Sequence, residues 1–418
     1  MSKAYTLQII RRLSALLLCF IFAGNLFAQH EKNIADSGKT DIKNTKTKSY
    51  GKDMNDVFKK ILHSKKENTA VEKVKKVSIT ILPAAGYTPQ TGFAGAITAG
   101  AAFYTDNIKY SKLSIIATSV TYTQYNQFLF PVNANIWLKK NKYNLIIDDH
   151  FLKYPSTTYG LGARSKQGDA YTLKYNYIRL HQTILKKIYK ELYAGAGVYY
   201  DYLWNITELD TIPGVKTSFQ KYGSNVKEKA VGIVLKLSLD TRDNQINTKS
   251  GTYTNIIFRP NFTFAGSDNN WQSLQLEYRK FIRLSTLSKN TLALWGYSWL
   301  TPGKGKPPYL LLPSTAWDDQ YNSGRGYVQG RFRAKDMIYA EAEYRFAISN
   351  NGLLGGVAFA NAQSFSKNLS KQLSVIAPGF GAGLRIKLNK FSDTNLCIDY
   401  GFGTNGSKGI FLNLGEVF

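Results

Sequence analysis

Residues 192–205 read LYAGAGVYYDYLWN, and apolar side chains occupy every second position. Leu192, Val198 and Trp204 share one parity, whereas Gly195 and Asp201 lie on the other. Because successive side chains of a strand point to opposite faces, this segment has an apolar face and a face that tolerates water. The pattern predicts a strand with lipid on one side and water on the other.

The same alternation recurs along residues 77–418. At roughly 20 residues per strand and connection, this length gives about 16 strands, so we expect an all-β, transmembrane antiparallel β-barrel. Expected strands include residues 92–104 as the first, 157–164 as the fifth and 409–418 as the last. Residues 77–88 are either a lead-in or part of the first strand.

The amino terminus has the features of an export signal. Lys3, Arg11 and Arg12 precede a largely apolar run, and Ala28 ends a plausible cleavage site, so residues 1–28 are expected to be a signal peptide. Cleavage removes Cys19 and leaves Cys397 alone, which excludes an intramolecular disulfide. Export and a barrel together predict the bacterial outer membrane.

Residues 29–76 form a polar stretch that we expect to be periplasmic and mostly flexible. Apolar residues at helical spacing within 53–63 predict one short amphipathic helix, either a plug or docking helix or a marginal helix without a role. The domain division is therefore 1–28, 29–76 and a barrel over 77–418.

The formal net charge is +26, from 54 Lys and Arg against 28 Asp and Glu. Export argues against nucleic acid as a partner. Outer-membrane lipid phosphates, including those of lipopolysaccharide, and acidic segments of partner proteins are the expected counterions; the alternative is a charge spread over solvated loops. With no metal-ligand spacing and no phosphate-binding glycine loop, we expect no metal and no cofactor.

Asp240-Thr241-Arg242-Asp243-Asn244, followed by Gly251, predicts a tight turn. Asp240 and Arg242 share a face and can form a charge-assisted hydrogen bond, while Gly251 suits a left-handed conformation. The run resembles the strand-turn-strand signature of the outer-membrane protein 85 superfamily, the BamA and TamA-like barrels of the bacterial surface antigen family. Thr248 stands where that family usually has proline, and an ordinary hairpin turn is the alternative.

A second stretch, Gly324-Arg325-Gly326-Tyr327, resembles the tip of the sixth extracellular loop of those barrels. The resemblance implies a long loop folded into the lumen, where Arg325 pairs with Glu343 and its neighbour Glu341. A guanidinium in a protein-walled lumen needs such anionic partners. The alternative is an ordinary exposed loop.

Two further matches depart from the family pattern or support it weakly. The family's Phe-x-Asp-x-Gly strand has Asn361 in place of Asp here, which predicts a softer lock resting mainly on Glu343. The terminal strand resembles the family's carboxyl-terminal recognition signal, with Gly415 as a possible kink; its residues are Gly409, Leu412, Leu414 and Phe418.

The resemblance implies a lateral gate between the first and last strands, weakened by Gly92 and Gly95 in the first strand. The alternative is that these glycines relieve crowding in a curved sheet. The implied function is insertion or translocation of protein or lipid within a larger complex, with client proteins and other assembly subunits as partners. Residues 30–76 are too short for a polypeptide-transport-associated domain, so another subunit is expected to supply such domains.

Two other function classes stay open. Cationic side chains on the lumen parity favour an anion-preferring pore; they are Lys236, Arg279, Arg345, Arg385 and Lys387. Asp148, Asp149 and His150 supply the minimum for general-base catalysis in a barrel enzyme. Charged residues at a strand end are usually only solvated, and we expect no enzyme.

Overall fold

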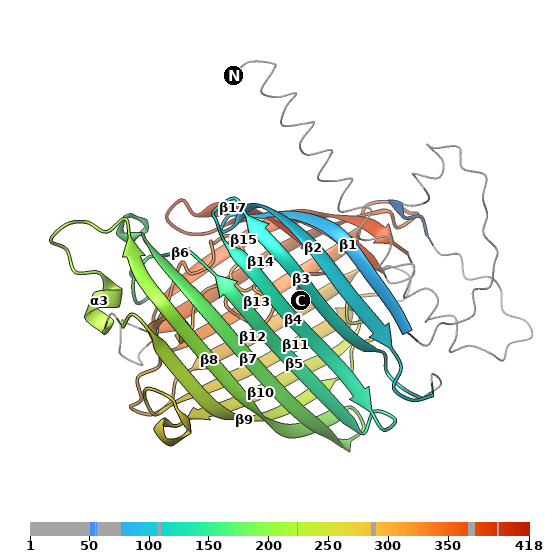
Figure 1. The fold of residues 1–418 in the computed structure, drawn as a ribbon. Coiled ribbons are helices and arrows are strands. Elements are labelled where there is room, and N and C mark those ends of the chain that lie inside the picture. The colour runs from blue at the N-terminus through green and yellow to red at the C-terminus, as the bar shows by residue number, and fades with distance from the viewer. Residues whose placement is uncertain are drawn as a thin grey trace, which may run out of the picture.

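The computed structural model describes residues 51–54, 56, 77–107, 110–223, 225–285, 290–366, 373–390 and 393–418. These residues form strands joined by turns and a few short helices (Figure 1). In chain order the elements are β1 (Val77–Thr88), β2 (Gly92–Phe103), β3 (Ser114–Thr123), β4 (Phe128–Leu138), β5 (Tyr143–Lys153), β6 (Ser156–Thr158), η1 (Gln167–Asp169), β7 (Tyr171–Tyr189), β8 (Leu192–Leu209), α3 (Ser218–Tyr222), β9 (Glu228–Asp240), β10 (Gly251–Asn261), η2 (Thr263–Ala265), β11 (Trp271–Arg283), β12 (Thr291–Leu300), η3 (Tyr309–Leu311), β13 (Met337–Ala347), β14 (Leu354–Ser366), β15 (Leu373–Asn389), β16 (Thr394–Phe402) and β17 (Lys408–Leu414).

The strands form one antiparallel barrel, in which each wall strand pairs with the next one along the chain. β5 pairs directly with β7, and β6 is a three-residue strip beside β7. Sixteen strands therefore make the wall, and the predicted all-β antiparallel barrel is confirmed. β1 and β17 lie side by side where the barrel closes. In the described part of the chain, no residue register joins these two strands.

The strand count was right, but the strand expected over residues 157–164 was wrong and the strand at 92–104 is the second, not the first. Val77–Thr88 is a full first strand, because it pairs with Gly92–Phe103 along its whole length. Gly92 and Gly95 therefore lie in the second strand. Gly92 has a φ of +61° at the tight turn between them. Residues 157–164 belong to the β5–β7 connection, where left-handed Gly160 and Gly162 interrupt the extended backbone.

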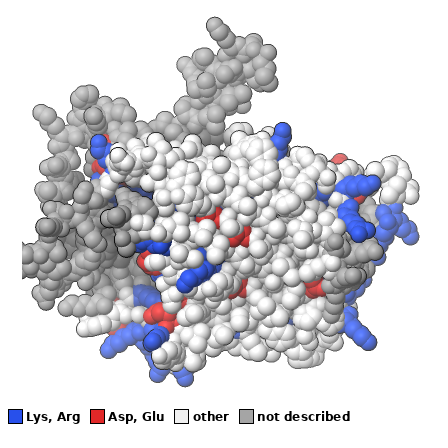
Figure 2. Space-filling model, turned by 180° about the vertical axis from the view of Figure 1, so that it is seen from behind, with Lys and Arg blue, Asp and Glu red and all other residues white. Residues whose placement is uncertain are grey.

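The wall has the two faces that the alternation predicted. In β13, Tyr339, Glu341 and Glu343 are buried against the lumen contents, whereas Ile338 and Tyr344 are exposed on the outside. Seen from behind, the wall is mainly uncharged, and Lys and Arg gather toward its ends (Figure 2). Among the described residues, no helix is both long enough and apolar enough to cross a membrane.

The two ends of the barrel differ. Three long connections, 154–170, 210–227 with α3, and 301–336, leave one end, which we call the loop end (Figure 1). Shorter turns, including 241–250, lie at the other, which we call the turn end. The connection 301–336 and the turn 241–250 thus lie at opposite ends, because β9 to β12 alternate in direction.

A short amino-terminal segment contacts the turn end. The backbone N–H of Lys52 donates to the carbonyl of Asn351 at 2.8 Å, and Met54 packs against Leu388 and Leu396. Met54 and Asp56 are helical, but the rest of the helix expected over 53–63 lies outside the described residues. So do the expected signal peptide and most of residues 29–76.

Candidate functional site: the lumen loop and the strand seam

The connection 301–336 returns from the loop end into the lumen. A bridge between Ser314 and Arg333 makes its base a hairpin, and the N–H of Thr315 donates to the carbonyl of Phe332 at 3.0 Å. Tyr309, Tyr327 and Phe332 are each at most 2% exposed. Because these side chains pack against lumen-facing residues of the wall, the loop fills much of the lumen.

Arg325 lies at the tip of this loop and is 2% exposed. Its Nη2 donates to Glu341 and Glu343 of β13, and its Nη1 donates to Asp399 of β16 at 2.6 Å. The guanidinium carbon stacks 3.7 Å from the ring centroid of Phe359. Three carboxylates and an aromatic face thus offset the desolvation of one buried cation.

Glycines on both sides allow the tip to approach the wall. Gly326 has a φ of +105°, and a Cβ there would lie 2.5 Å from the carbonyl oxygen of Phe402. On the wall, a Cβ at Gly401 would lie 2.7 Å from the N of Gly326, and one at Gly379 would lie 2.7 Å from the carbonyl oxygen of Arg325. Gly324 also has a left-handed φ, of +79°. Close backbone contact is possible only because these positions lack side chains.

Tyr327 anchors the tip to β15 and to the turn after β16. Its hydroxyl donates to the carbonyl of Pro378 at 2.6 Å and accepts from the N–H of Thr404 at 2.9 Å. A Cβ at Gly403 would lie 2.6 Å from its ring. The tyrosine is therefore wedged against the wall and hydrogen-bonded at its end.

The expectation that the lock rests mainly on Glu343 was wrong, because Arg325 also contacts Glu341 and Asp399. The side-chain N–H of Asn361 donates to the backbone carbonyl of Arg325 at 2.9 Å, so this amide holds the loop backbone and does not substitute for a carboxylate. Asp399 supplies the further carboxylate from another strand. Sequence reasoning missed Asp399, although it shares the inward parity of Asn395 and Cys397, which are also buried.

The lock continues into a ring of alternating charges. From Arg325 it runs through Glu343 to Arg345 at 2.5 Å, and Arg345 lies 3.7 Å from Glu416. Glu416 lies 2.8 Å from Arg385, and Arg385 lies 2.5 Å from Asp399. Asp399 contacts Arg325 again and so closes the ring. The ring joins the loop, three wall strands and the carboxyl-terminal tail. Any one member removed would leave a buried charge uncompensated.

The carboxyl-terminal residues also enter the lumen. β17 ends at Leu414, and Gly415, with a φ of +82°, turns the chain inward. Phe418 is 4% exposed, its ring centroid lies 5.3 Å from that of Trp295, and its backbone oxygen accepts from Arg345 at 2.8 Å. Residues 409–418 do not form one strand as expected, because the left-handed Gly415, named as a possible kink, ends β17 at Leu414.

The inward tail also contacts the loop, since the side-chain N–H of Asn322 donates to the carbonyl of Val417 at 2.9 Å.

A family model described as the Omp85 superfamily domain matches residues 107–416. The chain belongs to the Omp85 superfamily. No curated protein matches the chain.

Solved structures of this fold resemble the barrel at low sequence identity. BamA from Haemophilus ducreyi lacking POTRA domains 1–3 is 14% identical, with a TM-score of 0.55 over 83% of this chain and 73% of that one. CdiB from Acinetobacter baumannii is 12% identical, with a TM-score of 0.52 over 82% of this chain and 60% of that one. At these identities the likeness concerns the fold.

The turn 241–250 of this Omp85 barrel is built on the residues that the sequence singled out. Arg242 donates to both carboxylate oxygens of Asp240, at 2.9 and 2.8 Å, and Asp243 accepts from the N–H of Lys249 at 2.9 Å. Gly251 has a φ of +116°, and a Cβ there would lie 2.4 Å from the carbonyl oxygen of Thr241. The turn also holds the tail, because the N–H of Glu416 donates to the carbonyl of Ile246 at 3.0 Å.

The seam of the barrel lies between β1 and β17. β1 has 12 residues and β17 has 7. Near the loop end the two sides touch, since a Cβ at Gly409 would lie 2.8 Å from Cγ of Pro89 in the turn after β1. Leu412 is partly buried, and Leu414 is 45% exposed on the outer face. Toward the turn end, Gly415 takes the chain away from the wall.

Most residues named for the other function classes are engaged in ion pairs. Arg279 donates to Glu277 at 2.7 Å, and Arg345 and Arg385 belong to the charge ring. His150 hydrogen-bonds Asp148 at 2.6 Å, but the same carboxylate also lies 3.4 Å from Arg179. In this Omp85 barrel the three lumen arginines thus pair with carboxylates around a loop that occupies the lumen.

Proposed function

We propose that this barrel inserts or translocates polypeptides at the bacterial outer membrane through a lateral opening between β1 and β17. In this proposal the turn end faces the periplasm and the loop end faces the cell surface. The observation that carries it is the seam, the one contact between neighbouring wall strands for which the described residues give no register.

Strand exchange follows from the cost of unpaired backbone in lipid. An N–H or C=O group without a partner in the hydrocarbon region costs several kcal/mol. Since β17 is shorter than β1, part of the β1 edge is free to pair with an incoming strand by β-augmentation. The edge of β1 would act as a template that the client leaves when its own barrel closes.

The proposal includes partners. Superfamily membership and the barrel's likeness to BamA and CdiB support a role with client proteins, and we propose that further assembly subunits bind at the turn end. Lipid, including lipopolysaccharide, would contact the apolar wall. The proposed activity is non-covalent and needs no cofactor.

A reversible cross-link across the seam tests the proposal. A Pro89→Cys, Gly409→Cys pair joins the two sides where they touch. A Phe402→Cys, Lys408→Cys pair is the matched control, because these residues are already paired between β16 and β17. In proteoliposomes, the time course of folding of a urea-denatured outer-membrane barrel is measured for both oxidised proteins.

With the oxidised seam pair, we expect the client barrel to fold at least about tenfold more slowly, because a client strand can no longer reach the edge of β1. A reducing agent should restore the rate, and the control pair should stay active. Equal activity of the oxidised seam pair and the control would overturn the lateral opening. In cells, depletion that leaves all other outer-membrane barrels unchanged would overturn the assembly role.

A further inference from the structure

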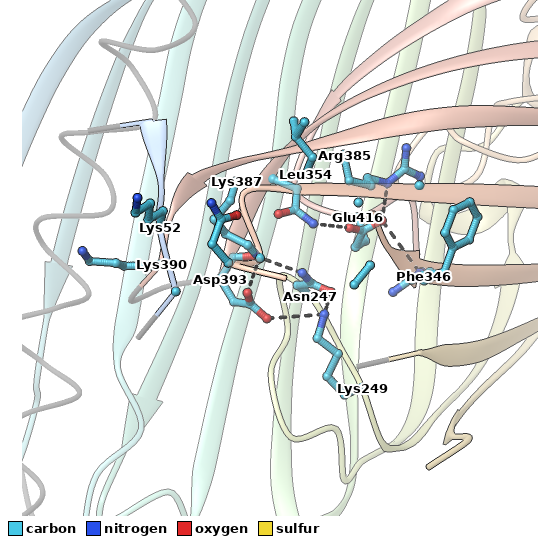
Figure 3. Close-up of a pocket in the computed structure, with 18 of the residues that line it drawn as sticks. Lys52, Asn247, Lys249, Phe346, Leu354, Arg385, Lys387, Lys390, Asp393 and Glu416 are labelled. Atoms are coloured by element: carbon cyan, nitrogen blue, oxygen red, sulfur yellow. Dashed lines mark hydrogen bonds and ion pairs between the residues drawn. The ribbon is translucent and has the colours of Figure 1, made fainter. Parts of the chain in front are cut away.

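A cavity of about 480 Å³ opens at the turn end, between the amino-terminal segment, the turn 241–250 and the first residues of β14 (Figure 3). Its volume falls within the range of ligand sites. Three members of the charge ring, Arg345, Arg385 and Glu416, line this cavity. The cavity therefore connects the mouth of the barrel with the network that holds the loop.

The lining is strongly cationic. Seven Lys or Arg side chains line the cavity against two acidic ones, Asp393 and Glu416. The cationic residues are Lys52, Lys249, Arg283, Arg345, Arg385, Lys387 and Lys390. In Figure 3 the labelled Lys52, Lys249 and Arg385 come from separate elements around one space. Such a concentration of one sign in a concave site raises the local concentration of anions.

Most of these cations have an acidic partner outside the lining, but Lys249 and Lys387 share one carboxylate. Arg345 pairs with Glu343, Arg385 with Asp399 and Lys390 with Asp56. Asp393 pairs with Lys387 and lies 3.5 Å from Lys249. Glu416 contacts both Arg385, at 2.8 Å, and Arg345, at 3.7 Å. Burial lowers the pKa of Lys249, and the nearby charge of Lys387 lowers it further. A bound anion would reduce the repulsion between Lys249 and its like-charged neighbours Lys387 and Arg345.

The rim already receives carboxylates from a peptide. Lys390 donates from its Nζ to Asp56 at 2.7 Å, and its backbone N–H donates to Asp53 at 3.1 Å. Both aspartates belong to the segment that precedes the barrel.

We propose that this cavity binds an acidic peptide segment, whose carboxylates pair with Lys52 on the rim and with Lys249 and Lys387, which share Asp393. The occupant would extend the contact that Asp53 and Asp56 begin. Binding of this kind stands independently of whether the seam opens.

The test uses the full chain in uncharged detergent and a fluorescein-labelled hexaglutamate peptide as the probe, with anisotropy as the readout. Lys249→Gln combined with Lys387→Gln removes two lining charges. Lys216→Gln combined with Lys304→Gln removes the same charge from exposed positions at the loop end. Folding of each variant is checked by its heat-dependent shift on gels.

The cavity variant should bind the probe about tenfold more weakly, a loss of ~1.4 kcal/mol, and the loop-end variant should match the unsubstituted protein. Binding should weaken as salt is added. An equal loss in both variants would assign binding to the overall charge of +26 and overturn the site. Competition by inorganic phosphate or by phosphatidylglycerol vesicles as strong as that by unlabelled hexaglutamate would overturn the peptide assignment in favour of phosphate.

A second measurement leaves most of the lining intact. Lys52→Cys places an exposed thiol on the rim, and Lys304→Cys places one at the loop end, while Cys397 is buried. A maleimide-hexaglutamate peptide should label Lys52→Cys several-fold faster than a neutral maleimide peptide does, since binding concentrates the reagent. The two peptides should label Lys304→Cys at similar rates. Equal rates for the two peptides at Lys52→Cys would contradict the proposal.

Discussion

The wall formed by β13–β16 and the wall formed by β1–β3 differ in what lies against their inner faces. Along β13 buried and exposed residues alternate from Met337 to Arg345, because the loop and the tail cover the inward side chains there. Along β2, apart from Gly92, the inward residues are only partly buried. Both walls have the same backbone pairing, so the difference arises from the lumen contents.

The comparison shows that one sequence builds a barrel with a fastened side and a lightly held side. The fastened side carries the charge ring, the aromatic contacts of Phe418 and the glycines beneath the loop tip. The lightly held side begins at the seam and includes many small residues, with the sequence GFAGAITAGAAF in β2. Local opening is drawn from regions with few buried contacts, so the β1–β2 hairpin is the part expected to move.

The largest expected effect comes from removing the guanidinium of the lock. Arg325→Ala leaves Glu341, Glu343 and Asp399 buried without this cation, and breaking such a buried network costs roughly 3–5 kcal/mol. Urea titration of the folded barrel and the heat-dependent gel shift measure the loss. Arg283→Ala, at a half-exposed arginine, is the control. If the two variants were equally stable, the lock would not hold the β13–β16 wall.

Truncating the tail's aromatic ring should have the next largest effect. Phe418→Ala removes a ring packed against Trp295 and Phe281, and loss of a buried aromatic costs about 3 kcal/mol. Intrinsic tryptophan fluorescence during urea unfolding reports on the contact with Trp295. If the tail lay outside the lumen, Phe418→Ala would leave the midpoint of urea unfolding unchanged.

The same substitution made in both walls compares them directly. Gly401→Ala places a Cβ 2.7 Å from the N of Gly326, whereas a Cβ at Gly95 meets nothing within 4 Å. Overpacking costs 1–3 kcal/mol, so Gly401→Ala should destabilise by about 2 kcal/mol and Gly95→Ala by much less. Equal unfolding midpoints in urea would show that the loop tip can retreat from the wall without cost.

The smallest effect tests the departure from the family pattern. Asn361→Asp restores the family's residue, but Asn361 lies directly opposite Glu341 on the neighbouring strand and donates to the carbonyl of Arg325. The new carboxylate would lose that bond and repel Glu341, a cost of about 1 kcal/mol. Asn361→Gln, which leaves this position uncharged, is the comparison in the same urea titration. A more stable Asn361→Asp protein would mean that the guanidinium reaches this position.

Alternation was enough to predict the barrel class, because a strand between lipid and lumen must repeat its polarity every two residues, and the length of residues 77–418 gave the strand number. It could not separate Val77–Thr88 from a lead-in, nor residues 157–164 from a strand. Those assignments depend on which segments pair, and pairing is a non-local choice. For the same reason Asp399 was missed, although its parity pointed inward.

By itself, the sequence determined the alternating wall and the glycine-flanked tip with its arginine, since these depend on strand periodicity and on local backbone freedom. The tertiary structure alone decided which carboxylates meet Arg325, that Asn361 holds a backbone carbonyl, and that Phe418 turns into the lumen. Charges far apart in the chain come together only when the sheet closes, and a buried guanidinium takes the partners that closure brings within reach.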